Sequence, residues 1–178
     1  MKIKKFDAAR SQLNTAIQLW FQGADPASIH TLVYAAYEVI HVISKKRGRT
    51  GSLVFDYDQV KPKFQRKWAD LVKGPANFLK HAKLDHDAEF DLDPMLTEYF
   101  IAMCIHGLHS MKEPLNAIEG AFKTWMILHQ PEFLTDEAVC ALSQTFDVKA
   151  IAGIKTIPKN EFLQRCIDVW GNSAIGRW

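Results

Sequence analysis

The dipeptide Asp-Pro occurs twice in the chain, as Asp25-Pro26 and Asp93-Pro94, and each time a long stretch with apolar residues at helical spacing follows. Aspartate caps the free amide groups in the first turn of a helix, and proline suits the first helical position, where a backbone N–H has no partner. The two dipeptides therefore predict the starts of two long helices, over residues 26–44 and 94–111.

Apolar residues recur three and four positions apart in most of the remaining sequence. This spacing predicts further helices over residues 7–21, 62–73, 114–129, 136–146 and 160–170. Gly74-Pro75 is expected to break or kink the chain before a short helix that ends near residue 81. The alternation typical of strands is nearly absent. We therefore expect one all-α domain over residues 1–178, an up-and-down helical bundle of four to five core helices at about 7–130 with additional C-terminal helices at about 131–178.

The formal net charge of +2 argues by itself for neither a nucleic acid nor a membrane as a partner. The longest apolar run, residues 99–105, is far shorter than the roughly 20 residues that cross a bilayer. An apolar leader segment is not visible, and Cys104, Cys140 and Cys166 lie too far apart to suggest a metal or redox motif. We expect a cytoplasmic protein with no membrane partner.

Charge is segregated along the chain. Residues 45–73 hold nine Lys and Arg against three Asp, whereas residues 85–98 hold six Asp and Glu and no Lys or Arg. The basic part begins with Lys45, Lys46, Arg47 and Arg49, whose side chains suit phosphate groups of a nucleic acid. Two explanations are open: the two segments lie against each other in the folded chain, or they serve contacts in a homo-oligomer, most simply a dimer.

A group of polar side chains follows Gly74-Pro75. Asn77, Lys80 and His81 share one face of the short predicted helix because they are three and four positions apart. An imidazole beside an ammonium group can accept or donate a proton near neutral pH. We predict these three as the candidate catalytic residues; the alternative is an exposed helix with ordinary polar residues.

Metal binding is a second candidate chemistry. Glu38 and His41 form a Glu-x-x-His motif, which helical bundles use to hold metal ions. His30 lies on the same stripe of the helix, and Asp85 in the acidic segment offers another carboxylate. The motif occurs once, so these four residues, together with His81, indicate a mononuclear site rather than a metal pair. The sequence identifies no particular cofactor.

The run QLNTAIQLWFQGADPASIHTLVYAAYEVIHVI and the later NFLKHAKLD resemble an uncharacterised family of small bacterial helical proteins over residues 1 to about 110. More distantly, a helix, a Gly-Ala-Asp-Pro turn and an alanine-rich helix with a central Glu are similar to the HEPN superfamily. This second resemblance implies a helical bundle, often a dimer, of the kind found in toxin–antitoxin, phage-defence and RNA-processing systems.

Active HEPN proteins cut RNA without a metal ion, using an Arg followed four to six residues later by a His. The resemblance implies that His81 handles the proton of the ribose 2′-hydroxyl while a cation steadies the phosphate. The chain departs from this pattern, because Asn77 stands nearest to the place of the Arg and Lys80 is the adjacent cation. The departure favours binding over cleavage.

Three functions are therefore open. The first is HEPN-like binding of RNA or a nucleotide, with or without cleavage, through Asn77, Lys80 and His81 and the basic residues from Lys45 to Arg49. The second is a metal-binding bundle or metal-dependent enzyme. The third is a non-catalytic module whose segregated charges serve dimerisation.

Overall fold

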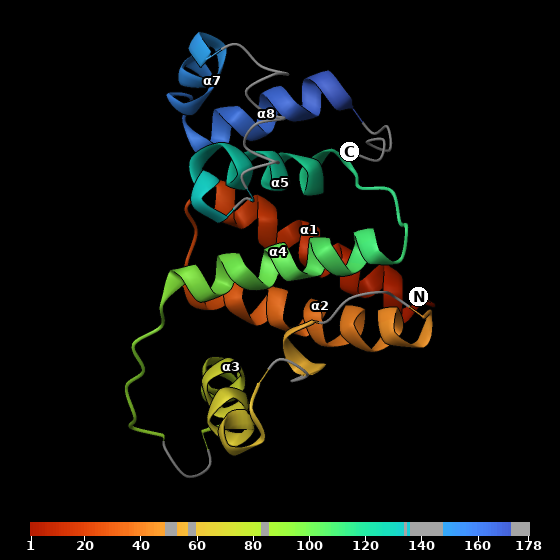
Figure 1. The fold of residues 1–178 in the computed structure, drawn as a ribbon, viewed down its shortest axis with the longest axis vertical. Coiled ribbons are helices and arrows are strands. Elements are labelled where there is room, and N and C mark those ends of the chain that lie inside the picture. The colour runs from red at the N-terminus through yellow and green to blue at the C-terminus, as the bar shows by residue number, and fades with distance from the viewer. Residues whose placement is uncertain (49–52, 57–59, 83–85, 134, 136–147, 172–178) are drawn as a thin grey trace. The chain divides into compact units, whose positions relative to one another are not determined.

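In the computed structural model, the described residues are 1–48, 53–56, 60–82, 86–133, 135 and 148–171. All regular elements among them are helices, which confirms the all-α prediction (Figure 1). Their contacts group into two compact units, Met1–Glu113 and Pro114–Trp178. The helix expected over residues 114–129 therefore groups with the C-terminal helices.

Three long helices form most of the first unit: α1 (Lys5–Phe21), α2 (Pro26–Lys46) and α4 (Pro94–Ser110). Both Asp-Pro starts are confirmed. The Asp25 carboxylate accepts a hydrogen bond from the Ser28 amide at 2.8 Å, and the Asp93 carboxylate accepts one from the Met95 amide at 2.9 Å. The hydrogen bond from the Ser28 amide also lowers the pKa of Asp25.

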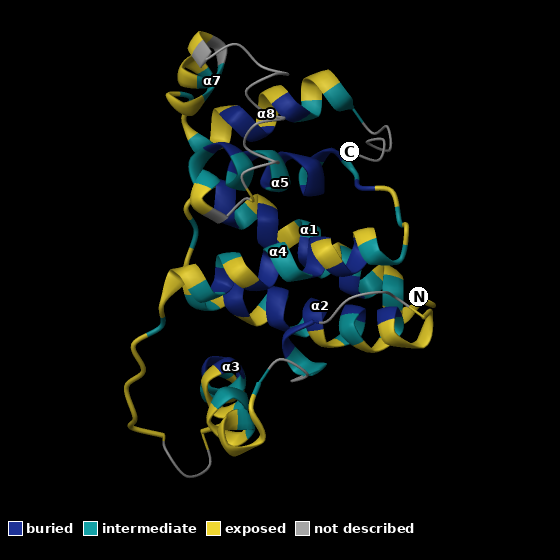
Figure 2. Ribbon diagram, in the orientation of Figure 1, coloured by how far each residue is buried: buried dark blue, intermediate teal, exposed yellow. Residues whose placement is uncertain are grey.

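α2 packs against both α1 and α4, so its burial is wider than a single stripe (Figure 2). The buried residues of α2 are Ile29, His30, Val33, Tyr34, Ala36, Tyr37, Ile40 and Ser44. α2 and α4 approach closely at Gly107, where an added Cβ atom would lie 2.8 Å from Cγ2 of Ile40 and 3.7 Å from Cδ1 of Leu53. The helix spacing there leaves room for a hydrogen atom only.

α3 (Gln65–Lys80) follows two short 3₁₀ turns, Val54–Asp56 and Pro62–Phe64. α3 continues through Gly74 and Pro75, so the predicted end at residue 73 is wrong. Proline removes the backbone hydrogen bond to the carbonyl of Leu71. The ring of Pro75 is buried, whereas the Leu71 side chain is 61% exposed, so water can reach this part of the helix. The packing of the buried Pro75 ring compensates for the hydrogen bond that the carbonyl of Leu71 lacks within α3.

α4 ends on a residue in the left-handed conformation, Lys112, with φ of 61°. Its amide donates to the carbonyl of His109 at 2.9 Å, and the amide of Glu113 donates to the carbonyl of Leu108 at 3.0 Å. These bonds satisfy carbonyl groups in the last turn, a role that usually falls to glycine. The left-handed residue turns the chain just before the boundary between the two units.

The second unit contains α5 (Ala117–His129), the 3₁₀ turn Pro131–Phe133, α7 (Val148–Lys155) and α8 (Lys159–Trp170). α7 is a helix that the sequence did not predict, and the helix expected over residues 136–146 lies outside the described residues. α5 begins with a capping box: the Glu119 amide donates to Oδ1 of Asn116 at 3.0 Å, and the Asn116 amide donates to the Glu119 carboxylate at 2.9 Å.

Aromatic contacts join the helices of this unit. The ring of Trp125 on α5 stacks on that of His129, with 3.7 Å between centroids, and meets Phe162 of α8 edge-on at 5.1 Å. Cys166 of α8 is buried, and burial raises the pKa of its thiol to about 11. Cys104 of the first unit is also a buried thiol, and Cys140 lies outside the described residues.

Over the stretches that the structure describes, none of the helices has both the length and the apolar character needed to cross a membrane.

Candidate functional site

One stripe of α2 carries three of the four predicted metal ligands, His30, Glu38 and His41. His30, Tyr34, Glu38 and His41 follow one another at steps of four, four and three, which places them on one side of the helix. The N-terminal part of this stripe, with His30 and Tyr34, is buried against α4. The C-terminal part, with Glu38 and His41, lies near α3 and the turn at Val54–Asp56.

His30 is completely buried and its Nδ1 lies 3.0 Å from the hydroxyl oxygen of Thr97 on α4. The imidazole stacks on Tyr34 and meets Phe100 edge-on. Burial, helped by the positive charge of Lys80, lowers the pKa of His30 to about 4, so the ring is neutral at pH 7. Its Nε2 is also buried and has no hydrogen-bond partner among the described residues.

Lys80 on α3 reaches two members of the stripe. Its Nζ lies 3.7 Å from Oε2 of Glu38 and 4.8 Å from the centre of the Tyr34 ring. The Glu38 side chain is 49% exposed and that of Lys80 is 35% exposed. An ion pair this open contributes at most about 1 kcal/mol to stability. The ammonium group is thus held near α2 but stays within reach of solvent.

Asp56 contacts the C-terminal end of the stripe and the residues that follow it on α2. Its Oδ1 lies 3.0 Å from Nε2 of His41 and 3.4 Å from Nζ of Lys45, and its Oδ2 accepts a hydrogen bond from the amide of Leu53 at 2.8 Å. The carboxylate is only 6% exposed. Asp56 therefore anchors the turn at 54–56 to the end of α2.

The predicted metal ligands are not brought together in the described part of the chain. His30 lies beside Thr97, Glu38 beside Lys80 and His41 beside Asp56, and Asp85 lies outside the described residues. Among the residues that the structure describes, no three or more His, Cys, Asp or Glu side chains are arranged to hold a metal ion.

The predicted catalytic residues lie at the C-terminal end of α3. Asn77 and Lys80 belong to its last turn, and His81 is the first residue after the helix, with an extended backbone. The amide of His81 donates to the Asn77 carbonyl at 3.0 Å. All three residues are exposed, but Lys80 turns towards α2, so the three side chains share one end of the helix without a hydrogen bond between them in the described structure.

The predicted phosphate-binding residues at the end of α2 point in two different directions. Lys45 lies beside Asp56, and Lys46 is exposed. Arg47 points elsewhere: its guanidinium lies 2.6 Å from the Glu113 carboxylate and 4.8 Å from the ring centre of Phe6. Arg47 thus ties the ends of α1, α2 and α4 together. Arg49 lies outside the described residues.

Sequence reasoning missed two cations that share the side of α3 on which Lys80 lies. Arg66, Lys73 and Lys80 are seven residues apart and hence fall on one stripe, with Asn77 beside it. Nζ of Lys73 lies 5.0 Å from the centre of the Phe55 ring, which parallels Lys80 over Tyr34. We call Arg66, Lys73, Asn77 and Lys80 the basic flank of α3. The seven-residue spacing of the cations could have revealed it, had α3 been predicted as one helix.

No protein family model, curated protein or solved structure matches this chain.

Proposed function

We propose that the protein binds RNA through phosphate contacts on the basic flank of α3. The observation that carries this proposal is the seven-residue repeat of Arg66, Lys73 and Lys80 along one side of α3. Cations in a row on one helix face can follow a phosphate backbone, and such contacts supply most of the affinity of non-specific nucleic-acid binding. The sequence resemblance to the HEPN superfamily favours RNA among phosphate ligands.

The residues of the flank have different parts in this proposal. Arg66 and Lys80 are exposed and contact phosphate groups, while Lys73 is half-buried over Phe55 and adds to the positive field. Asn77 offers a neutral donor and acceptor to ribose or base. His81, exposed just beyond the helix, is the group that could take the proton of a ribose 2′-hydroxyl. Lys45 and Lys46 extend the positive surface at the end of α2.

The test is fluorescence anisotropy with a dye-labelled single-stranded RNA over a series of salt concentrations. The triple variant Arg66→Gln, Lys73→Gln, Lys80→Gln should bind more weakly, and the slope of log K against log salt should fall by about 1.4, since Arg66 and Lys80 are the two lost phosphate contacts and each contact to single-stranded nucleic acid contributes roughly 0.7. The matched control is Lys2→Gln, Lys4→Gln, Lys5→Gln, which removes the same charge from exposed residues near the N-terminus.

Four outcomes of this test are informative. A retained salt slope in the control and a reduced one in the flank variant support the proposal. No binding by the unmodified protein at low salt overturns it, and so does an equal loss in both triple variants, because binding would then follow net charge alone. Competition by unlabelled adenosine triphosphate would assign the flank to nucleotides instead of RNA.

Cleavage is tested with the same RNA on a denaturing gel. A product that forms with the unmodified protein and disappears in His81→Gln adds catalysis to binding. Intact RNA under conditions where the anisotropy shows binding limits the function to binding.

A further inference from the structure

The side of α3 away from the basic flank exposes large apolar side chains. Phe64 and Leu71, seven residues apart, are 49% and 61% exposed, and Phe78, which is half-buried, follows seven residues later. Phe78 contacts Phe90, itself 43% exposed, with 5.2 Å between ring centroids. Single exposed apolar residues are ordinary, but a line of them along a helix marks an interaction surface. We call Phe64, Leu71, Phe78 and Phe90 the apolar flank.

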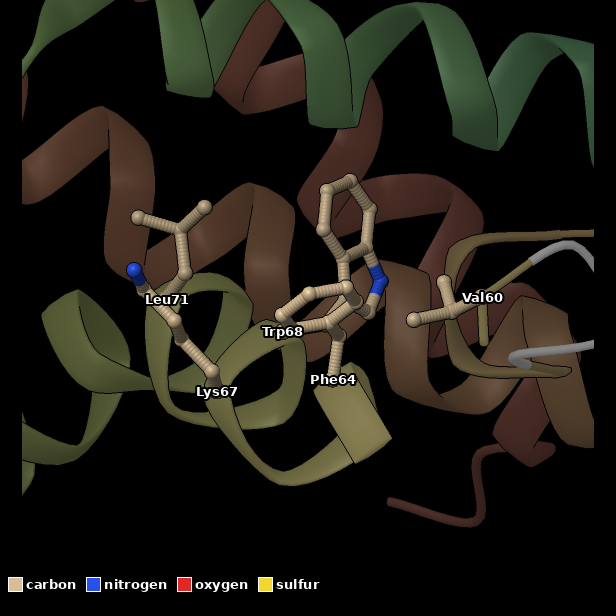
Figure 3. A pocket seen from close by; sticks show the side chains of 5 residues that line it. All are labelled: Val60, Phe64, Lys67, Trp68 and Leu71. Atoms are coloured by element: carbon tan, nitrogen blue, oxygen red, sulfur yellow. The ribbon is translucent and has the colours of Figure 1, made fainter. Parts of the chain in front are cut away.

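The N-terminal half of the apolar flank is hollowed. Val60, Phe64, Lys67, Trp68 and Leu71 line an open pocket of about 180 Å³ (Figure 3). Trp68 is fixed there because its Nε1 donates to the carbonyl of Val54 at 3.3 Å. A cavity of about 150 Å³ is enough for benzene. The pocket can therefore receive one aromatic side chain.

The apolar flank is self-complementary. Leu71 stands midway between Phe64 and Phe78, with seven residues on either side. If a second α3 lies antiparallel to the first, on a two-fold axis at Leu71, then Leu71 meets its own copy. Phe78 of each chain then reaches the pocket beside Phe64 of the other. A two-fold interface uses the same patch twice in this manner.

The charges at the two ends of the apolar flank also favour an antiparallel pair of α3 helices. The end at Phe64 carries Lys61, Lys63 and Lys67 and no acid, whereas the end at Phe90 carries Asp87, Glu89 and Asp91 and no Lys or Arg. In the described part of the chain, none of these Lys and acidic residues forms an ion pair with a member of the other group, so the two segments do not satisfy each other within one molecule. An antiparallel pair brings basic ends onto acidic ends twice, and a parallel pair brings like charges together.

We infer that the apolar flank of α3 binds a second copy of this chain, with the two α3 helices antiparallel across a two-fold axis at Leu71. The inference is independent of RNA binding. Phe64 and Arg66 are two residues apart, hence on nearly opposite sides of the helix, and the same holds for Leu71 and Lys73. The basic flank stays accessible in the dimer.

The first test measures molecular mass by light scattering after size-exclusion chromatography, over a range of protein concentrations. The unmodified chain should give the mass of two chains, and Leu71→Asp should give the mass of one, because it places two carboxylates on the axis. Val169→Asp is the matched control, since Val169 on α8 is apolar and 78% exposed. Circular dichroism confirms that each variant is folded, and the exposure of Leu71 makes a folding defect of the variant unexpected.

The second test distinguishes the antiparallel pair from other assemblies. The variant Lys63→Glu, Lys67→Glu has two acidic ends, and the variant Asp87→Lys, Glu89→Lys has two basic ends. Each alone should be monomeric, and an equimolar mixture should regain the mass of two chains. A mixture that stays monomeric overturns the arrangement.

Two other outcomes would also overturn the inference. One is a monomer at all concentrations for the unmodified chain, and the other is a dimer that survives Leu71→Asp, which would place the interface elsewhere. If the monomer instead sediments with anionic phospholipid vesicles and loses this property in Leu71→Asp, the flank belongs to a lipid surface and the dimer is refuted.

Discussion

The ammonium group of Lys80, at the end of α3, lies 3.7 Å from the carboxylate of Glu38, in the middle of α2. In the sequence these residues belonged to different hypotheses, Lys80 to phosphate binding and Glu38 to metal binding. Their proximity gives Glu38 a role that neither hypothesis contained, because a carboxylate next to a phosphate-binding cation opposes the approach of the phosphate.

Glu38→Gln should therefore strengthen RNA binding. Two unit charges about 6 Å apart in water interact by roughly 0.7 kcal/mol, so the dissociation constant should fall about threefold at low salt. The gain should shrink as salt screens the charges. Fluorescence anisotropy measures both effects. Glu161→Gln is the control, since Glu161 pairs with Arg165 on α8, outside the basic flank. Weaker binding by Glu38→Gln would mean that the carboxylate contacts the ligand directly.

His30 should make stability depend on pH between about 4 and 6.5. Its pKa is lowered to about 4 in the folded chain, against 6.5 for an unperturbed histidine. Within this window the unfolded chain binds a proton that the folded chain does not, so stability falls as the pH falls, by up to about 3 kcal/mol in total. Urea unfolding at pH 7 and at pH 4.5 should show a smaller difference for His30→Gln than for the unmodified chain.

The matched control for this prediction is His109→Gln, because His109 is an exposed histidine on α4. It should keep the pH dependence of the unmodified chain. An unchanged pH dependence in His30→Gln would show that carboxyl groups alone account for acid sensitivity.

Gly107→Ala should destabilise the first unit by about 1–3 kcal/mol, the usual cost of overpacking. The new Cβ atom would meet Cγ2 of Ile40 at 2.8 Å, and this methyl group is on a branched carbon close to the backbone of α2, so it cannot move away freely. Urea unfolding followed by circular dichroism measures the loss. In Gly153→Ala, on α7, the added atom meets nothing within 4 Å, and stability should be equal or slightly higher.

Asn116→Ala should cost about 1 kcal/mol, because it removes the acceptor for the Glu119 amide at the start of α5. Asn160→Ala is the comparison, since Asn160 is exposed within the first turn of α8 and caps no helix. Thermal and urea unfolding should place Asn116→Ala below the unmodified chain and Asn160→Ala at or above it. Equal stabilities would show that water replaces the side chain of Asn116 at the cap.

Features that depend on residues close together in the sequence were predictable from the sequence. The starts of α2 and α4 follow from Asp25-Pro26 and Asp93-Pro94 because a cap acts within three residues. The continuity of α3 was not predictable, since the intrinsic effect of Pro75 is to end a helix, and only its burial against the rest of the unit reverses that effect.

Individual residues of the candidate site were predictable from the sequence, but the contacts between them were not. The stripe of α2 from His30 to His41 followed from the helical repeat, and the positive charge of the region followed from counting. Which side chains meet depends on the packing of α3 and of the turn at Val54–Asp56 against α2, and pairs such as Glu38 with Lys80 or His41 with Asp56 have no local signature. The first half of the basic flank, Arg66 and Lys73, was missed because the predicted helix ended at residue 73, and the seven-residue repeat that links these two cations to Lys80 was therefore not visible.

The left-handed conformation of Lys112 is a place where the stability of the chain can be raised. A residue with a Cβ atom pays roughly 1 kcal/mol or more in that conformation, whereas glycine adopts it freely. Protein engineers who need a more robust form of this chain could begin there. Lys112→Gly would relax the backbone at the end of α4 while the core, the basic flank and the apolar flank keep their side chains.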